Sequence, residues 1–196
     1  MQWIGIIILS IAFCVVYGVL HDQITARICV EYFTIGHPPV FSTQDPTMLG
    51  IGWGVIATWW VGAILGVPLS FAARVGIAPK RTVRQLILPM LILMLCSGVF
   101  AILMGFVGFF AAKNGWVFLV GDMAKRVPQD RHILFLTDLW AHSLFLTDLW
   151  AHSASYFSGF LGGIILIVRT WRTRTSLMNQ NKTEQSDGHE AVDRPL

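Results

Sequence analysis

A tandem repeat supplies two pairs of side chains whose types and spacing could do chemistry. Residues 134–143 and 144–153 both read LFLTDLWAHS, without a single change. Each copy has an aspartate and a histidine four residues apart, which are Asp138 with His142 and Asp148 with His152. On a helix this spacing places carboxylate and imidazole on one face, where they can relay a proton or orient a metal ligand.

A second group of ionisable side chains lies in residues 21–39, HDQITARICVEYFTIGHPP. We expect a helix to continue through this stretch as far as Gly36. The side chains that would share one face of it are His21, Thr25, Cys29 and Tyr32. Arg27 and Glu31 would be neighbours at i,i+4. Buried ionisable groups need partners. The stretch is therefore either an Arg27–Glu31 ion pair bracing a loop, with His21 and Asp22 in capping roles, or part of a functional site.

The elements that position these residues belong to a membrane protein. Hydrophobic residues make up 55% of the 196-residue chain and charged residues 13%, and the mean hydropathy is +0.63. Soluble domains carry about a quarter charged residues. No basic stripe interleaved with aromatic residues is present, so we do not expect a nucleic-acid partner.

Four segments are long and apolar enough to be spans, which need about 20 residues each. They are residues 3–20, 46–73, 86–112 and 149–169. Asp45 before Pro46 predicts the start of the second span, and Thr82 with Gln85 predicts a capping box before the third. The first segment lacks the basic start and the cleavage site of a signal peptide, so we expect it to be retained.

The positive charges predict how the spans are oriented. The loop between the second and third spans has four basic residues and no acid, and Arg169, Arg172 and Arg174 lie at or beyond the end of the fourth. Such regions stay on the cytoplasmic side. We therefore predict an all-α integral membrane four-helix bundle over residues 1–174, with both termini inside (N-in/C-in) and two outward-facing connections. Residues 175–196 are polar and are predicted to be a disordered cytoplasmic tail.

This topology brings the ionisable groups to the outer side. Asp148, His152 and Tyr156 would form a stripe in the outer part of the fourth span, which is either a functional site or a hydrogen bond that locks the helix. The first copy of the repeat would lie about 15 Å further out and be turned by roughly 80°. We therefore expect the second copy to be the working one. The predicted polar pocket consists of His21, Asp22, Arg27, Glu31, Asp148, His152 and Tyr156.

Three classes of function remain open. The first is a small transport, permeation or assembly component without a cofactor. The second is a redox subunit that binds haem or a transition metal through His21 and His152. The third is a membrane enzyme, but the chain has no GxSxG or GxxxxGK[ST] motif, so we favour a protein that is not an enzyme. The expected partners are the lipid bilayer and either further copies of the chain or another membrane subunit.

The strings HDQITARICVEYFTIGHPPVF and DLWAHSASY resemble those of a group of bacterial multi-pass membrane proteins that have no assigned activity. The resemblance covers the four spans but not the tail. It implies a membrane location, which would be the bacterial inner membrane, and a single copy of TDLWAHS. It implies no substrate and no catalytic residues.

Overall fold

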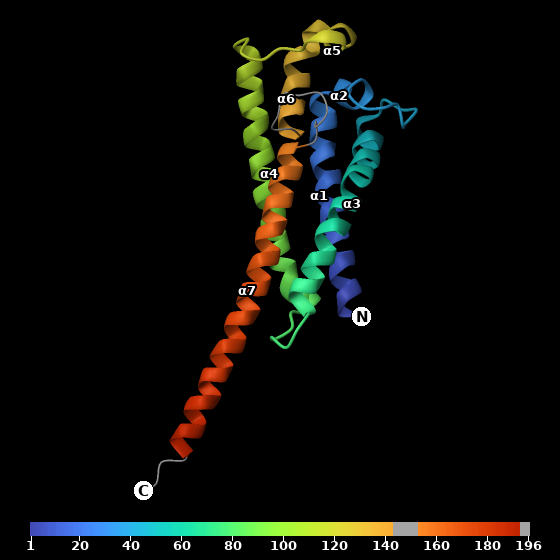
Figure 1. Ribbon diagram of the computed structural model, residues 1–196. Helices are drawn as coiled ribbons and strands as arrows, with labels where there is room; N and C mark the ends of the chain where they lie inside the picture. Colours follow the sequence, from blue (N-terminus) through green and yellow to red (C-terminus); the bar gives the residue numbers. More distant parts are fainter. Residues whose placement is uncertain (143–152, 193–196) are drawn as a thin grey trace.

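The computed structural model describes residues 1–142 and 153–192, and every regular element in them is a helix (Figure 1). The elements in chain order are α1 (Gln2–Ile28), α2 (Val30–Thr34), α3 (Pro46–Arg74), α4 (Val83–Lys113), α5 (Gly121–Arg126), the 3-10 helix η1 (Gln129–Arg131), α6 (His132–His142) and α7 (Ser153–Val192).

Three of these helices, α1, α3 and α4, have the length and apolar composition to cross a membrane. They contain the residues of the first three predicted spans, so the long apolar helices expected there are present. The first residues of the fourth predicted span lie outside the described part of the chain. Helix α7 continues to Val192 through most of the segment for which we predicted a disordered tail. Its C-terminal half extends away from the other helices (Figure 1).

The predicted helix starts are confirmed at two positions. The Asp45 carboxylate accepts a hydrogen bond from the Met48 amide at 2.8 Å, which satisfies one of the donors left free at the start of α3. The Thr82 amide donates to the Gln85 side chain at 2.9 Å, as one arm of a capping box at the start of α4.

Small residues let α1 and α3 approach closely. A Cβ atom at Gly54 would lie 2.6 Å from the Val19 Cα, and one at Gly62 would lie 2.6 Å from the Ile11 Cα. These neighbours are backbone atoms, so no larger residue fits unless the helices separate. The glycines of α3 therefore form a helix-packing face, as is common for helices in lipid.

The first copy of the repeat is part of the bundle. Its residues form most of α6, which packs along the C-terminal half of α4, where Gly108 leaves room for Trp140. Phe135 and Leu136 of this copy are both 3% exposed. One straight helix through both copies would project the first copy beyond the spans, or the copy could lie flat in the membrane interface, whereas in the structure it packs against α4. Packing of the first copy against α4 and α2 buries its apolar face, which a straight continuation of the fourth span would leave exposed.

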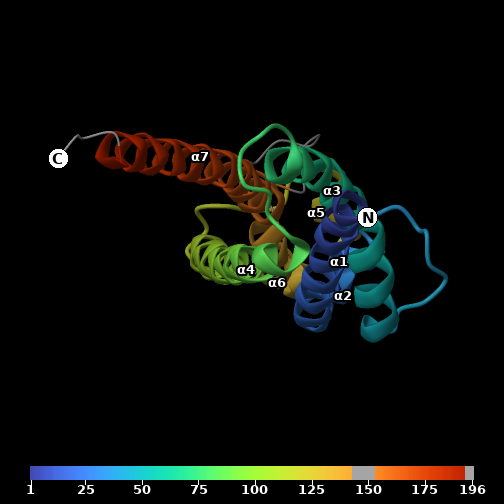
Figure 2. The same cartoon turned by 90° about the horizontal axis from the view of Figure 1, so that it is seen from below.

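The two ends of the bundle differ in character. At one end, which we call the α2 end, lie α2, α5, η1 and the start of α6 (Figure 1). At the other end, which we call the basic end, lie Met1 and the connection between α3 and α4. Figure 2 looks onto the basic end, with α7 leaving it to one side.

Candidate functional site

Five polar side chains from four elements come together at the α2 end. They are Asp22 of α1, Cys29 between α1 and α2, Glu31 of α2, Arg131 of η1 and Asp138 of α6. We call this group the polar cluster. More than a hundred residues separate its first member from its last, so only the tertiary structure assembles it.

A break in the first helix sets the geometry of the polar cluster. Cys29 has an extended backbone, with φ −147° and ψ 92°, so α1 ends at Ile28 and the short helix α2 starts in a new direction. The Cys29 amide still donates to the Thr25 carbonyl at 3.0 Å. The single continuous helix predicted through this stretch is therefore wrong. The change of direction brings Glu31 within reach of η1.

Glu31 and Arg131 form a half-buried ion pair. The Arg131 Nε lies 3.1 Å from a Glu31 carboxylate oxygen. The Arg131 side chain is 29% exposed and the Glu31 side chain is 20% exposed. Arg131 also donates to the Ile28 carbonyl at 3.3 Å, at the end of α1. One guanidinium thus ties η1 to both sides of the break at Cys29.

The surroundings lower the pKa of Glu31. Partial burial disfavours its charge, but hydrogen bonds from its own amide, the Cys29 thiol and Arg131 outweigh that effect. The pKa of Arg131 moves in the opposite direction. Partial desolvation would lower it, and the hydrogen bond and charge of Glu31 raise it overall. Both shifts favour the charged pair.

The Cys29 thiol is a neutral hydrogen-bond donor in the polar cluster. Its sulfur lies 3.3 Å from the second Glu31 carboxylate oxygen, and the residue is 0% exposed. Burial raises its pKa to about 12, despite an opposing backbone hydrogen bond with Tyr32, and the nearby carboxylates add to the rise. A thiolate is the nucleophilic form of cysteine, so this residue is not placed to act as a nucleophile.

Two buried carboxyl groups complete the polar cluster. Asp22 is 6% exposed and Asp138 is 0% exposed. Asp138 is close enough to interact electrostatically with Asp22, Glu31 and Arg131. If all were ionised, three carboxylates would face one guanidinium. Burying that excess of negative charge is costly, so such a group is best accommodated when it holds a proton or a cation.

Two further side chains of α1, Tyr17 and His21, lie in the helix just before Asp22. The His21 ring stacks on the Tyr17 ring at a centroid distance of 5.8 Å. Tyr17 in turn lines an internal cavity of about 40 Å³ together with Thr58 and Ser97. The Ser97 hydroxyl is buried and has no hydrogen-bond partner among the described residues. The rest of the lining is mostly apolar and includes Val61, Leu65 and Met94.

Arg27 does not form the ion pair with Glu31 that the i,i+4 spacing suggests. It is exposed and donates to the Gln23 carbonyl at 2.6 Å, to the Gln23 side chain at 2.7 Å and to the Thr47 hydroxyl at 2.9 Å. It therefore joins α1 to the start of α3. The expected Arg27–Glu31 ion pair is wrong, because the helix ends between the two residues and Glu31 turns toward Arg131.

The pocket at the α2 end is not lined by the predicted charged residues. It has a volume of about 320 Å³ and lies under the loop of residues 38–44, with Phe33, Leu49 and Trp53 as its floor. His37 packs beside it, with its ring centroid 4.6 Å from that of Trp53. His21, Asp22 and Glu31 instead lie within the packed helices, so this end has an aromatic pocket beside a polar cluster.

Several predicted site residues lie outside what the structure describes. Asp148 and His152 are outside the described residues, and so is the side chain of Tyr156, whose backbone belongs to α7. Two expectations therefore stay predictions. One is that the second copy of the repeat is the functional one, and the other is that His21 and His152 together bind a metal or haem. Within residues 1–142 and 153–192, no three His, Cys, Asp or Glu side chains gather in a way that could hold a metal ion.

The sequence interpretation missed three members of the polar cluster as site residues, namely Cys29, Arg131 and Asp138. Asp138 had a signal, since it occupies the same place in the first copy as Asp148 does in the second. Arg131 had none beyond being a basic residue in a mixed-charge loop. Comparisons of the chain with protein-family models, with curated proteins and with solved structures found no match.

Proposed function

We propose that this chain is a small transport or permeation component in which the carboxyl groups of Asp22 and Asp138 take up a proton or a small cation. The observation that carries the proposal is the burial of these two groups, one on α1 and one on α6, close enough to interact electrostatically. Ionisable groups at membrane depth are rare and usually mark ion or proton pathways.

The ion pair beside these carboxyl groups supports this role. The Arg131 guanidinium is already held by Glu31 and the Ile28 carbonyl. Its positive charge is therefore shared with Glu31, and ionisation of both Asp22 and Asp138 would add negative charge to the polar cluster. A proton on one of them, or a small cation between them, would remove the excess negative charge. Release of the proton or cation would restore it, which makes uptake reversible.

The polar side chains below the cluster support an inward path. His21 and Tyr17 are stacked, and Tyr17 borders the cavity that Thr58 and Ser97 also line. Imidazole, phenol and hydroxyl groups can each accept and give up a proton, so these side chains are candidates for the steps of an inward path. The path would run from the α2 end toward the centre of the bundle, between helices α1, α3 and α4.

We further propose that the chain is a four-span protein of the bacterial inner membrane with both termini in the cytoplasm. Basic residues concentrate at the basic end, and positive charge favours the cytoplasmic side. The α2 end would then face outward. Reporter fusions after Asp45, Lys80 and Asn179 test this. We expect an external signal at Asp45 and internal signals at the other two, and an external signal at Lys80 would overturn the orientation.

The transport proposal is tested with the full chain in lipid vesicles that contain a pH-sensitive dye. A proton or potassium gradient across the vesicle should dissipate faster than in empty vesicles. We expect Asp138→Asn to abolish that difference, because the neutral amide has the size of the carboxyl but cannot hold a proton or cation. The matched control is Asp122→Asn, at an exposed residue in a surface ion pair 3.9 Å long.

Two outcomes would count against the proposal. One is a vesicle containing the native chain that leaks no faster than an empty vesicle to either ion. The other is equal activity of the Asp138→Asn and Asp122→Asn variants. Circular dichroism and thermal unfolding of each variant show that lost flux is not lost folding.

A further inference from the structure

The basic end carries positive charge with no acid among the neighbouring residues of the sequence. Seven cations belong to it, which are Arg74, Lys80, Arg81, Arg84, Arg169, Arg172 and Arg174. The chain has no Asp or Glu between Asp45 and Asp122, and none from residue 149 to residue 183. Among the side chains that the structure describes, none of these cations forms a salt bridge. This end of the bundle therefore offers unpaired positive charge to an anionic partner.

Arg174 fixes α7 against the connection between α3 and α4. Its guanidinium is 1% exposed and donates four hydrogen bonds to backbone carbonyls, of Pro79 at 2.7 Å, Ala72 at 2.6 Å, Val75 at 2.9 Å and Ala78 at 2.8 Å. These bonds satisfy its donors without neutralising its charge. Burial lowers the pKa of Arg174, and the nearby charges of Arg74 and Arg81 lower it further.

The packing that Arg174 fixes leaves an apolar groove between α3 and α7. The groove has a volume of about 410 Å³ and an almost entirely apolar lining. Its walls are Pro68 and Phe71 on α3, Val75 just after α3, and Ile167, Val168 and Trp171 on α7. Phe71, Val168 and Trp171 are about half exposed, at 54%, 48% and 50%. In a bilayer these side chains would be in contact with lipid.

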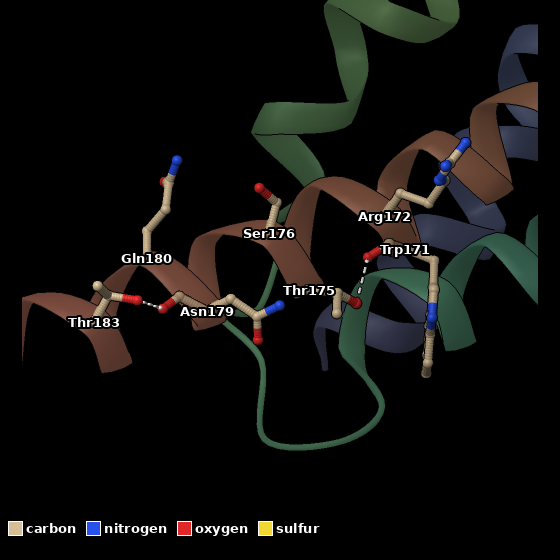
Figure 3. A pocket seen from close by; sticks show the side chains of 7 residues that line it. All are labelled: Trp171, Arg172, Thr175, Ser176, Asn179, Gln180 and Thr183. Atoms are coloured by element: carbon tan, nitrogen blue, oxygen red, sulfur yellow. Dashed lines mark hydrogen bonds between the residues drawn. The ribbon is translucent and has the colours of Figure 1, made fainter. Parts of the chain in front are cut away.

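The groove ends where the surface becomes charged and polar. Arg172 does not line the groove itself, but it follows Trp171 and lies one helical turn beyond Val168, and both of these residues do. Figure 3 shows Trp171 and Arg172 leaving α7 in different directions, and beyond them a face with Thr175, Ser176, Asn179, Gln180 and Thr183. A tryptophan at such a boundary is typical of the membrane interface.

We infer that this groove binds a phospholipid with an anionic headgroup. One acyl chain would lie between Phe71 and Val168, and the headgroup phosphate would lie beside Arg172 at the level of Trp171. A lipid fits better than a free anion because the apolar groove is continuous with the lipid-exposed faces of α3 and α7. Basic pockets between membrane helices are known to select anionic headgroups.

The inference is tested by tryptophan quenching with brominated lipids. The full chain is placed in phosphatidylcholine bilayers that contain a minority of either brominated phosphatidylglycerol or brominated phosphatidylcholine. The chain has eight tryptophans, so the contribution of the groove is taken as the difference between the native chain and Trp171→Phe. We expect the anionic lipid to quench this component at several-fold lower mole fraction than the zwitterionic lipid.

Charge variants test the headgroup contact. An arginine near a membrane surface attracts anionic lipid with a preference of about fivefold. Arg169→Gln with Arg172→Gln should therefore remove most of the preference for phosphatidylglycerol, and both residues are exposed, so folding should be kept. Arg126→Gln, an exposed arginine at the α2 end, is the matched control and should leave the preference unchanged.

Three results would overturn the inference. The first is equal quenching of the Trp171 component by the two lipids. The second is a preference that survives in the doubly substituted variant. The third is relief of quenching by millimolar inorganic phosphate, which would indicate a site for free anions and not for lipid.

Discussion

Glu31 and Arg131 should be energetically coupled, and Glu31 and Arg27 should not. The pair joins the break between α1 and α2 to η1 through a 3.1 Å contact. Exposed ion pairs contribute about 0–1 kcal/mol, whereas removal of one partner from a buried pair costs about 3–5 kcal/mol. With exposed fractions of 20% and 29%, this pair lies between these limits. We expect a coupling energy of about 1–2 kcal/mol.

A double-mutant cycle measures this coupling. The variants are Glu31→Gln, Arg131→Met and their combination, and the free energy of unfolding is followed by circular dichroism in mixed detergent micelles. The coupling energy is the change in unfolding free energy of the double variant minus the sum of the changes in the two single variants. The matched cycle uses Arg27→Met in place of Arg131→Met. Its coupling energy should be near zero, because Arg27 bonds to Gln23 and Thr47 instead.

The coupling should also depend on pH in one direction. The pKa of Glu31 in the folded chain is below its ordinary value of 4.5. The ion pair therefore stabilises the fold fully above pH 4.5, and this contribution is lost as the pH falls below 4.5 and through the lowered pKa. Arg131 stays charged throughout, so no corresponding loss is expected between pH 5 and 8.

Two results would refute the reasoning about this ion pair. A coupling energy for Arg27 with Glu31 as large as that for Arg131 would mean that the helix continues through Cys29, as the sequence pattern alone suggested. A coupling for Arg131 that persists unchanged well below pH 4 would mean that the carboxylate charge is not its source.

Three further predictions concern the repeat, the helix packing and the thiol. Deleting residues 143–152 leaves a chain with one copy of the repeat. Its unfolding temperature should not fall, because all the packing contacts described for α6 and α7 come from residues outside the deletion; a large drop would show that the second copy holds the bundle together. Gly62→Ala should destabilise the fold by about 1–3 kcal/mol, since its Cβ would meet the α1 backbone. Gly159→Ala has open space around its Cβ and should be near neutral in the same unfolding assay. Equal effects of the two substitutions would contradict the packing of α1 on α3. For the thiol, the other two cysteines are replaced by alanine and Cys29 is labelled with maleimide at pH 8. It should react about a thousandfold more slowly than a free thiol, because a pKa of about 12 leaves little thiolate. Rapid labelling of the folded chain would show that the site opens to water.

Much of the secondary structure follows from the sequence, because long apolar runs in lipid have to satisfy their backbone hydrogen bonds internally. The runs in α1, α3 and α4 are of this kind, and their starts are marked by local side-chain bonds at Asp45 and Gln85. The polar cluster could be predicted only in part. Asp22 and Glu31 stood out as ionisable groups beside a span, but the pattern gave no means of choosing their partners.

Two features are determined by the tertiary structure alone, namely the break between α1 and α2 and the position of the first copy of the repeat. The periodicity of residues 21–35 is compatible with one helix, and packing of Cys29 and Tyr32 into the core under Phe135 selects the broken one. The two copies of LFLTDLWAHS are identical, so no local rule can distinguish them. Gly108 of α4 provides the space that seats the first copy in the bundle, and this contact, between residues far apart in the chain, brings Asp138 to Asp22.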